Sequence, residues 1–265
     1  MTEAAGRPPL GHVVFIGAGP GAADLITVRG ARRLAEAEVV LFDALTDPAL
    51  RELAPQARWI DVGKRGFCHA PKQTEINAML VRCAQQYRRV VRLKGGDPSV
   101  FGRLEEELLA LAAEGIGCEV VPGVTAAIAA AAATQRPLTR RGLGRSVSLS
   151  TAMTKEGSLA EATPPSADTE VFYMAGRQLG ALSRRLLDAG WPADTPVLVV
   201  SQAGTPDQRA SDHEVATLAA ASMLHAGRPA IVTVGAGARP VLAADGRSPH
   251  AATMPHTAAA GHPAA

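Results

Sequence analysis

The chain has 265 residues and a formal net charge of +2. This length fits one large domain or two small ones, and the 47% of hydrophobic residues is enough for a sizeable core. Lysines and arginines are scattered along the chain, which argues against the single basic stripe of a nucleic-acid-binding protein.

Strand and helix patterns alternate through the first half of the chain. Apolar runs predict strands at residues 13–16, 39–43, 59–63, 90–93 and 118–122. Stripes of apolar residues predict helices at 25–35, 76–83 and 104–111, and Asp47 with Pro48 predicts the cap of a further short helix. This alternation is typical of a mostly parallel, doubly wound sheet.

The second half repeats the pattern more loosely. It predicts strands at 146–150, 170–174, 196–200 and 230–235, with a helix at about 178–189. Glycines and arginines at 139–145 separate the two series, so we expect α/β domains at 11–140 and 141–242 with a ligand cleft between them. Segments 1–10 and 243–265 lack periodicity and are expected to be disordered.

The segment "VVFIGAGPGAAD" at 13–24 matches the glycine-rich fingerprint of dinucleotide-binding proteins. Gly17, Gly19 and Ala22 occupy the three small positions, and Asp43 ends the next apolar run, where such enzymes bind ribose hydroxyls. One loop of this kind is a weak signal. It keeps a nicotinamide-dependent oxidoreductase open as an interpretation.

Unusual loops also follow the third, fourth and fifth strands: "GKRGFCHAP" at 63–71, "KGGDPSVFGR" at 94–103 and "PGVTAA" at 122–127. Ligands of parallel sheets bind at the carboxyl ends of the strands. The paired Gly95 and Gly96 allow a ligand to lie directly on the backbone. A dinucleotide enzyme needs no second glycine loop, so these loops favour a compact ligand with an adenosine and an amino-acid arm.

The segments "GAGPG", "RVVRLKGGDPSVFGR", "VVPGVTAAIAA", "PLTRRG" and "GTPDQR" resemble the tetrapyrrole methylase family, and within it the members that act on uroporphyrinogen III. The resemblance covers about residues 11–240. It implies two α/β domains of the tetrapyrrole methylase type with the ligand cleft between them, assembly as a homodimer, and no metal. It also implies C-methylation of uroporphyrinogen III to precorrin-2 by two methyl transfers from S-adenosylmethionine, for siroheme or cobalamin biosynthesis.

The resemblance also implies roles for individual residues. Asp43 would be the proton acceptor and Lys64 the proton donor, which suits a reaction in which a methylated pyrrole ring must shed a proton. The expected contacts of S-adenosylmethionine are Pro20, Gly95, Gly96, Asp97, Val100, Thr125, Ala126, Met174, Ala203 and Gly204. The expected clamps for the substrate carboxylates are Arg65, Arg103, Arg140, Arg141 and Arg145.

The chain departs from the usual family pattern at Ala22, Phe42, Ser99, Leu104, Glu105 and Ala203. Two further alternatives remain open, the second of them because of these departures. One is a sibling methylase that acts on another tetrapyrrole, or on a ribosomal or protein target. The other is a ligand sensor without catalytic activity.

Cysteines and hydropathy bear on the cellular location. Cys68, Cys83 and Cys118 have no metal-like spacing, so we expect neither zinc nor disulfides and favour a reducing compartment. No apolar stretch is long enough to span a bilayer, and the sequence does not open on a signal-peptide pattern. These features predict a cytoplasmic protein without membrane or nucleic-acid partners.

Overall fold

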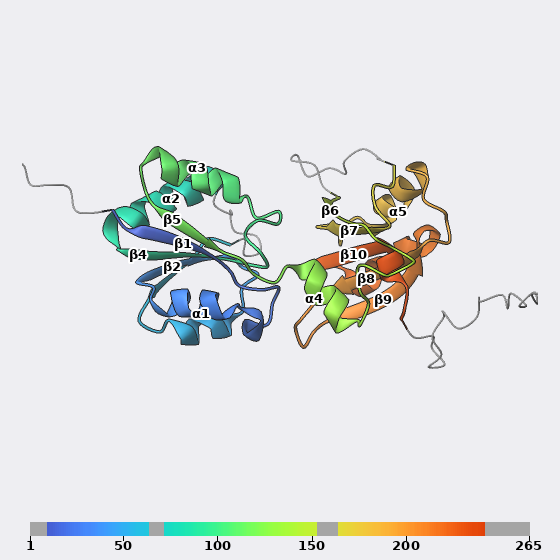
Figure 1. Ribbon diagram of the computed structural model, residues 1–265, viewed down its shortest axis with the longest axis horizontal. Helices are drawn as coiled ribbons and strands as arrows, with labels where there is room; N and C mark the ends of the chain where they lie inside the picture. The colour runs from blue at the N-terminus through green and yellow to red at the C-terminus, as the bar shows by residue number, and fades with distance from the viewer. Residues whose placement is uncertain (1–9, 64–71, 153–163, 242–265) are drawn as a thin grey trace, which may run out of the picture.

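The computed structural model describes residues 10–63, 72–152 and 164–241, which form two five-stranded sheets with helices on their faces (Figure 1). The end segments that the sequence predicts to be disordered lie outside the described residues, apart from Leu10. Within the described ranges, no helix is long and apolar enough to cross a membrane.

The first sheet consists of β1 (His12–Gly17), β2 (Val39–Phe42), β3 (Arg58–Asp61), β4 (Arg89–Lys94) and β5 (Cys118–Val121). Its strand order is β3-β2-β4-β1-β5, and all of its strand pairs are parallel. The prediction of a parallel sheet in the first half is therefore confirmed. Helices cover both faces, which is why β2 is buried at every position and reads as a continuous apolar run.

Three helices pack on the first sheet. Figure 1 shows α1 (Val28–Ala35) on one face, and α2 (Gln73–Gln86) and α3 (Leu104–Ala113) on the other. The expected helix at 25–35 begins later than predicted, because the Thr27 hydroxyl accepts a hydrogen bond from the amide of Gly30 and caps α1. Leu25 belongs instead to a short 3-10 helix (Ala23–Leu25), and Val28 is 69% exposed.

The second sheet consists of β6 (Val147–Thr151), β7 (Thr169–Tyr173), β8 (Pro196–Ser201), β9 (Arg209–Glu214) and β10 (Ala230–Gly235), in the order β6-β7-β10-β8-β9. Only β6 and β7 pair in parallel, and the other pairs are antiparallel. The second half therefore differs from a loose repeat of the first. Its predicted strands exist, but the sheet is mixed.

Of two helices that pack on the second sheet, the sequence predicts one and misses the other. The helix α5 (Leu179–Asp188) packs on one face, as predicted, together with a 3-10 segment at Val215–Ala221 that leads into α6 (Ser222–His225). The helix α4 (Ala126–Ala133) was not predicted, and it packs on the other face. Although α4 precedes the expected boundary at 139–145, its side chains contact the second sheet, so we propose a division between β5 and α4.

Candidate active site

The loops that follow β1, β4 and β5 pack against each other at the carboxyl edge of the first sheet. The amide of Gly96 donates to the carbonyl oxygen of Gly19 at 2.7 Å, and the amide of Gly19 donates back to Gly96 at 3.3 Å. A Cβ on Gly123 would lie 2.4 Å from the carbonyl oxygen of Gly96 and 2.7 Å from the Cα of Gly17. Only glycine at 123 allows the three loops to approach this closely.

Asp97 fastens the β4 loop to the β5 loop. One carboxylate oxygen accepts a hydrogen bond from the amide of Gly123 at 2.8 Å, and the other accepts from the amide of Ser99 at 2.8 Å. The sequence predicts that Asp97 contacts a ligand. Its bonds also give it a structural task, because they hold Gly95 and Gly96 at the sheet edge.

Gly96 turns an open face toward Thr125. Its φ of +71° lies in the left-handed region, and a Cβ built on it would lie 4.0 Å from the Cα of Thr125, the nearest described atom outside residues 95–97. A side-chain carbon at 96 would therefore meet no close contact with the rest of the described chain, unlike one at Gly123. Such a face, bounded by backbone, fits a ligand that lies directly against the chain, as the amino-acid arm of S-adenosylmethionine would.

Tyr173, at the end of β7, links the second sheet to these loops. Its hydroxyl lies 2.7 Å from the hydroxyl of Thr125 and accepts a weaker hydrogen bond from the amide of Ala127 at 3.4 Å. Its ring lies 4.9 Å from the ring of Phe101, between centroids. Tyr173 thus joins the β4 loop and the start of α4 to β7, directly before Met174, which is 54% exposed.

A second bridge lies at the β1 loop. Leu25 packs in the same apolar cluster as Ala203, and a Cβ on Gly204 would lie 3.1 Å from the Leu25 side chain. Pro20 belongs to the same loop. The ten predicted contacts of S-adenosylmethionine therefore follow the carboxyl ends of β1, β4, β5, β7 and β8, and the two bridges bring these ends together.

Removing the hydroxyl of Tyr173 is expected to loosen this arrangement. Tyr173→Phe keeps the ring but loses the hydrogen bonds to Thr125 and Ala127, so the free energy of unfolding should fall by about 1 kcal/mol. S-adenosylmethionine should also bind several-fold more weakly in calorimetry. Tyr87→Phe, at the end of α2, is the matched control and should change neither quantity. Equal losses in both variants would contradict the linking role of Tyr173.

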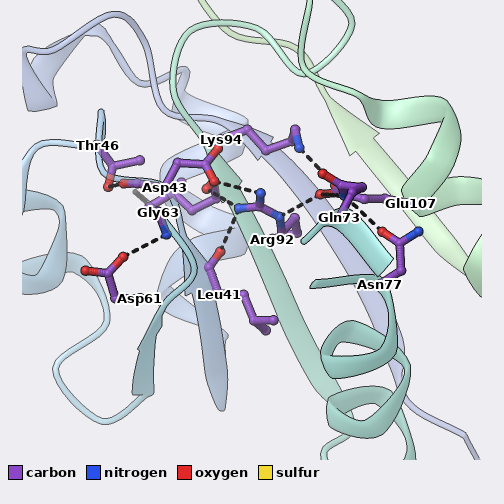
Figure 2. A network of polar contacts seen from close by, with 11 residues as sticks. Leu41, Asp43, Thr46, Asp61, Gly63, Gln73, Asn77, Arg92, Lys94 and Glu107 are labelled. Carbon is purple, nitrogen blue, oxygen red and sulfur yellow. Dashed lines mark hydrogen bonds and ion pairs between the residues drawn. The ribbon is translucent and has the colours of Figure 1, made fainter. Parts of the chain in front are cut away.

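Asp43 directly follows β2, and an arginine fixes its carboxylate (Figure 2). Oδ1 accepts a hydrogen bond from Nη2 of Arg92 at 2.7 Å, and the side chain is 30% exposed. Within the described part of the chain, Oδ2 has no hydrogen-bond partner. Asp43 thus presents an oriented carboxylate at the sheet edge. Lys64 and Arg65, the other residues predicted nearby, lie outside the described residues.

Behind Asp43 lies a buried ionic network that the sequence analysis missed. Nε of Arg92 donates to Oε1 of Glu107 at 3.1 Å, and Nζ of Lys94 donates to Oε2 at 2.9 Å. Burial lowers the pKa of the Lys94 ammonium, as does the Arg92 charge, whereas Glu107 raises it. A signal was present: Glu107 falls on the apolar stripe of α3 that Leu104 and Leu111 define, where a charge needs a buried partner.

Among the predicted arginine clamps that the structure describes, Arg103 lies apart from Arg140, Arg141 and Arg145. Arg103 forms two hydrogen bonds of 2.7 Å with the carboxylate of Glu106, close to the β4 loop. Arg140 donates to the carbonyl oxygen of Arg239 at 2.6 Å, and the amide of Arg145 donates to Asp168 at 2.9 Å. Arg239 follows β10 and Asp168 precedes β7, so Arg140, the exposed Arg141 and Arg145 lie at the edge of the second sheet opposite Met174.

The site geometry does not fit a dinucleotide. In a dinucleotide-binding fold the glycine loop leads directly into a helix whose N-terminus holds the pyrophosphate. Here α1 begins only at Val28, after the 3-10 helix, and Thr27 already caps it. The amide of Gly19 already donates to Gly96, and Oδ1 of Asp43 already accepts from Arg92.

Sequence comparisons give close relatives. A uroporphyrinogen-III C-methyltransferase of Pseudomonas aeruginosa is 41% identical over 239 residues, which cover 88% of this chain and 96% of the relative. A siroheme synthase of Azotobacter vinelandii is 47% identical over 212 residues, which cover 77% of this chain and 46% of the relative. The chain thus matches less than half of that longer protein.

A structural comparison gives a similar protein. The crystal structure of a uroporphyrin-III C-methyl transferase from Thermus thermophilus, complexed with S-adenyl homocysteine, matches with a TM-score of 0.76 and 37% identity, covering 85% of this chain and 97% of that chain. The family model of the tetrapyrrole (corrin/porphyrin) methylases matches residues 12–220. With most of its length matched by this model, the chain belongs to the tetrapyrrole methylase family.

Proposed function

We propose that the protein transfers methyl groups from S-adenosylmethionine to carbon atoms of uroporphyrinogen III. The observation that carries this proposal is the open face of Gly96 between the β4 loop and Thr125, in a chain 37% identical to a methyltransferase complexed with S-adenyl homocysteine. The 41% identity to a uroporphyrinogen-III C-methyltransferase over almost its whole length supports the same substrate.

Some residues of the site bind the methyl donor, and others transfer protons. When bound, S-adenosylmethionine supplies an electrophilic methyl group on its sulfonium sulfur. Gly96 and Thr125 orient this donor, with Met174 and Gly204 closing the site from the second sheet. A pyrrole carbon that gains a methyl group carries a positive charge into its ring, and the ring regains neutrality by losing a proton. Asp43 accepts this proton through Oδ2. Lys64, the predicted proton donor, gives a proton to one ring position only where the ring loses another, so each methyl transfer releases one proton net.

Several finer points belong to the same proposal. The product is precorrin-2, formed by two successive methyl transfers, and it feeds siroheme or cobalamin biosynthesis. The matches to siroheme synthases support the siroheme branch. The protein acts in the cytoplasm as a homodimer. Arg103 is the nearest to the β4 loop of the predicted carboxylate clamps that the structure describes, and it binds the substrate by exchanging Glu106 for a substrate carboxylate.

Filling the face of Gly96 is expected to block the methyl donor. Gly96→Val should weaken S-adenosylmethionine binding at least about tenfold, or about 1.4 kcal/mol, in a calorimetric titration. Its positive φ should also cost about 1–2 kcal/mol of stability. Gly115→Val is the matched control, because Gly115 has a φ of +67° and open space around it, at the end of α3. It should lose similar stability and no affinity.

The ligand class can be tested on the parent protein with the same titration. S-adenosylmethionine should give a saturable heat of binding, and NADH should give none. Saturable binding of NADH together with unaltered donor affinity in Gly96→Val would contradict the proposed site.

A further inference from the structure

Four charged side chains form a continuous chain from the sheet edge into the interior (Figure 2). It runs from Asp43 through Arg92 and Glu107 to Lys94, with contacts of 2.7, 3.1 and 2.9 Å in that order. Arg92 is 3% exposed and Glu107 is fully buried, whereas Asp43 remains 30% exposed. The formal charges of the four groups sum to zero.

Stability alone is a poor reason to keep such a network. Removing charges from water costs free energy that their mutual attraction often fails to recover, and apolar side chains would fill the same space at no such cost. Ionisable groups in unusual surroundings instead gather at functional sites. This network reaches the surface at Asp43, the residue to which the proposed function gives the proton.

We propose that Arg92 is a positioning residue for Asp43 and that Glu107 and Lys94 set the proton affinity of the Asp43 carboxylate. This inference rests on the proposed function. The planar guanidinium of Arg92 binds Oδ1 of Asp43 with one nitrogen and Oε1 of Glu107 with another, so it fixes the orientation of the Asp43 carboxylate.

Charge balance explains the other two residues. Arg92 alone would stabilise the Asp43 carboxylate and make it a weak base, because a neighbouring positive charge lowers the pKa of a carboxyl group. The negative charge of Glu107 offsets Arg92, and the positive charge of Lys94 offsets part of Glu107. Asp61, at the end of the neighbouring β3, adds a further negative charge, with Oδ1 accepting from the amide of Gly63 at 2.8 Å. Asp61 is the same in every variant below.

This inference predicts opposite effects from two substitutions in one cluster. Glu107→Gln removes a negative charge, so the pKa of Asp43 should fall. The acid limb of the kcat/KM profile should then shift to lower pH by roughly one unit. Lys94→Met removes a positive charge, so the pKa of Asp43 should rise and the acid limb should shift to higher pH. The double variant removes both charges and should return the pKa of Asp43 toward its parent value. A purely structural role would instead make the double variant the worst of the three.

The experiment measures the pKa of Asp43 by NMR of isotope-labelled aspartate carboxyl groups, assigned with Asp43→Asn, together with the pH profile of methyl transfer. Glu119→Gln is the matched control, because Glu119 accepts a hydrogen bond from Nε of Arg33 at 2.9 Å on the same sheet. It should change neither the pKa of Asp43 nor the pH profile. Should a single variant fail to fold, the charge-balanced double variant and the remaining single variant still give the sign of the effect.

The outcomes separate the inference from the proposed function. An Asp43 pKa that falls in Glu107→Gln and recovers in the double variant supports the inference. An Asp43 pKa that is unchanged in Glu107→Gln, or that moves in the same direction in both single variants, overturns it, whether or not the parent methylates its substrate. A parent protein that gives no methylated tetrapyrrole overturns the proposed function instead, since the carboxyl titration does not depend on turnover.

Discussion

Asp43→Asn is expected to lower turnover by about a hundredfold or more while leaving the affinity for S-adenosylmethionine almost unchanged. The amide keeps the size of the side chain and can still accept the hydrogen bond from Arg92, but it cannot take up a proton. Turnover is measured under anaerobic conditions with uroporphyrinogen III, and affinity by calorimetry.

Asp24→Asn is the control variant. Asp24 is an exposed aspartate in the β1 loop, and its substitution should leave turnover at the parent level. Loss of donor affinity in Asp43→Asn with little change in turnover would indicate a ribose-binding carboxylate. Normal turnover in Asp43→Asn would place the base elsewhere.

Arg92→Met should give the largest loss of stability. The substitution leaves the fully buried Glu107 with only Lys94 as a charged partner and leaves Asp43 without its hydrogen bond. Breaking a buried ion pair from one side typically costs about 3–5 kcal/mol. Denaturant unfolding measures this change directly.

Arg33→Met supplies the contrast for that measurement. Arg33 forms an ion pair of the same kind with Glu119, but its side chain is 42% exposed, so the expected loss is below about 1 kcal/mol. Similar losses for Arg92→Met and Arg33→Met would show that the buried network contributes no more than a surface pair.

The sequence predicted the first sheet better than the second for a physical reason. Strands of a parallel sheet are covered on both faces, so they appear as apolar runs such as "VVLF". By contrast, β9 is an edge strand with the sequence "RASDHE" and mostly exposed side chains, and it gives no such run. The helix α4 is almost entirely alanine, so it has no polar face to reveal its period.

In the candidate site, too, the sequence predicts some features and misses others. The loops around Gly96 and Thr125 could be predicted because ligands of parallel sheets bind where the strands end. Tyr173 could not, because it acts through a contact with Thr125, 48 residues away in sequence. Glu107 stands out as a charge on the apolar stripe of α3, but the sequence does not show that Arg92 is its partner. In strand β4 the letters "VVRL" read as an apolar run, and nothing local shows that Arg92 reaches Asp43.

The most direct test of the whole account is a single-turnover reaction of the parent protein with uroporphyrinogen III and S-adenosylmethionine that carries a deuterated methyl group, analysed by mass spectrometry without oxygen. The account predicts a tetrapyrrole product heavier by two labelled methyl groups, preceded by a product with one. An unmodified tetrapyrrole, in a protein that binds S-adenosylmethionine, would contradict the assignment of uroporphyrinogen III as substrate and would favour a ligand sensor or a methylase with another target.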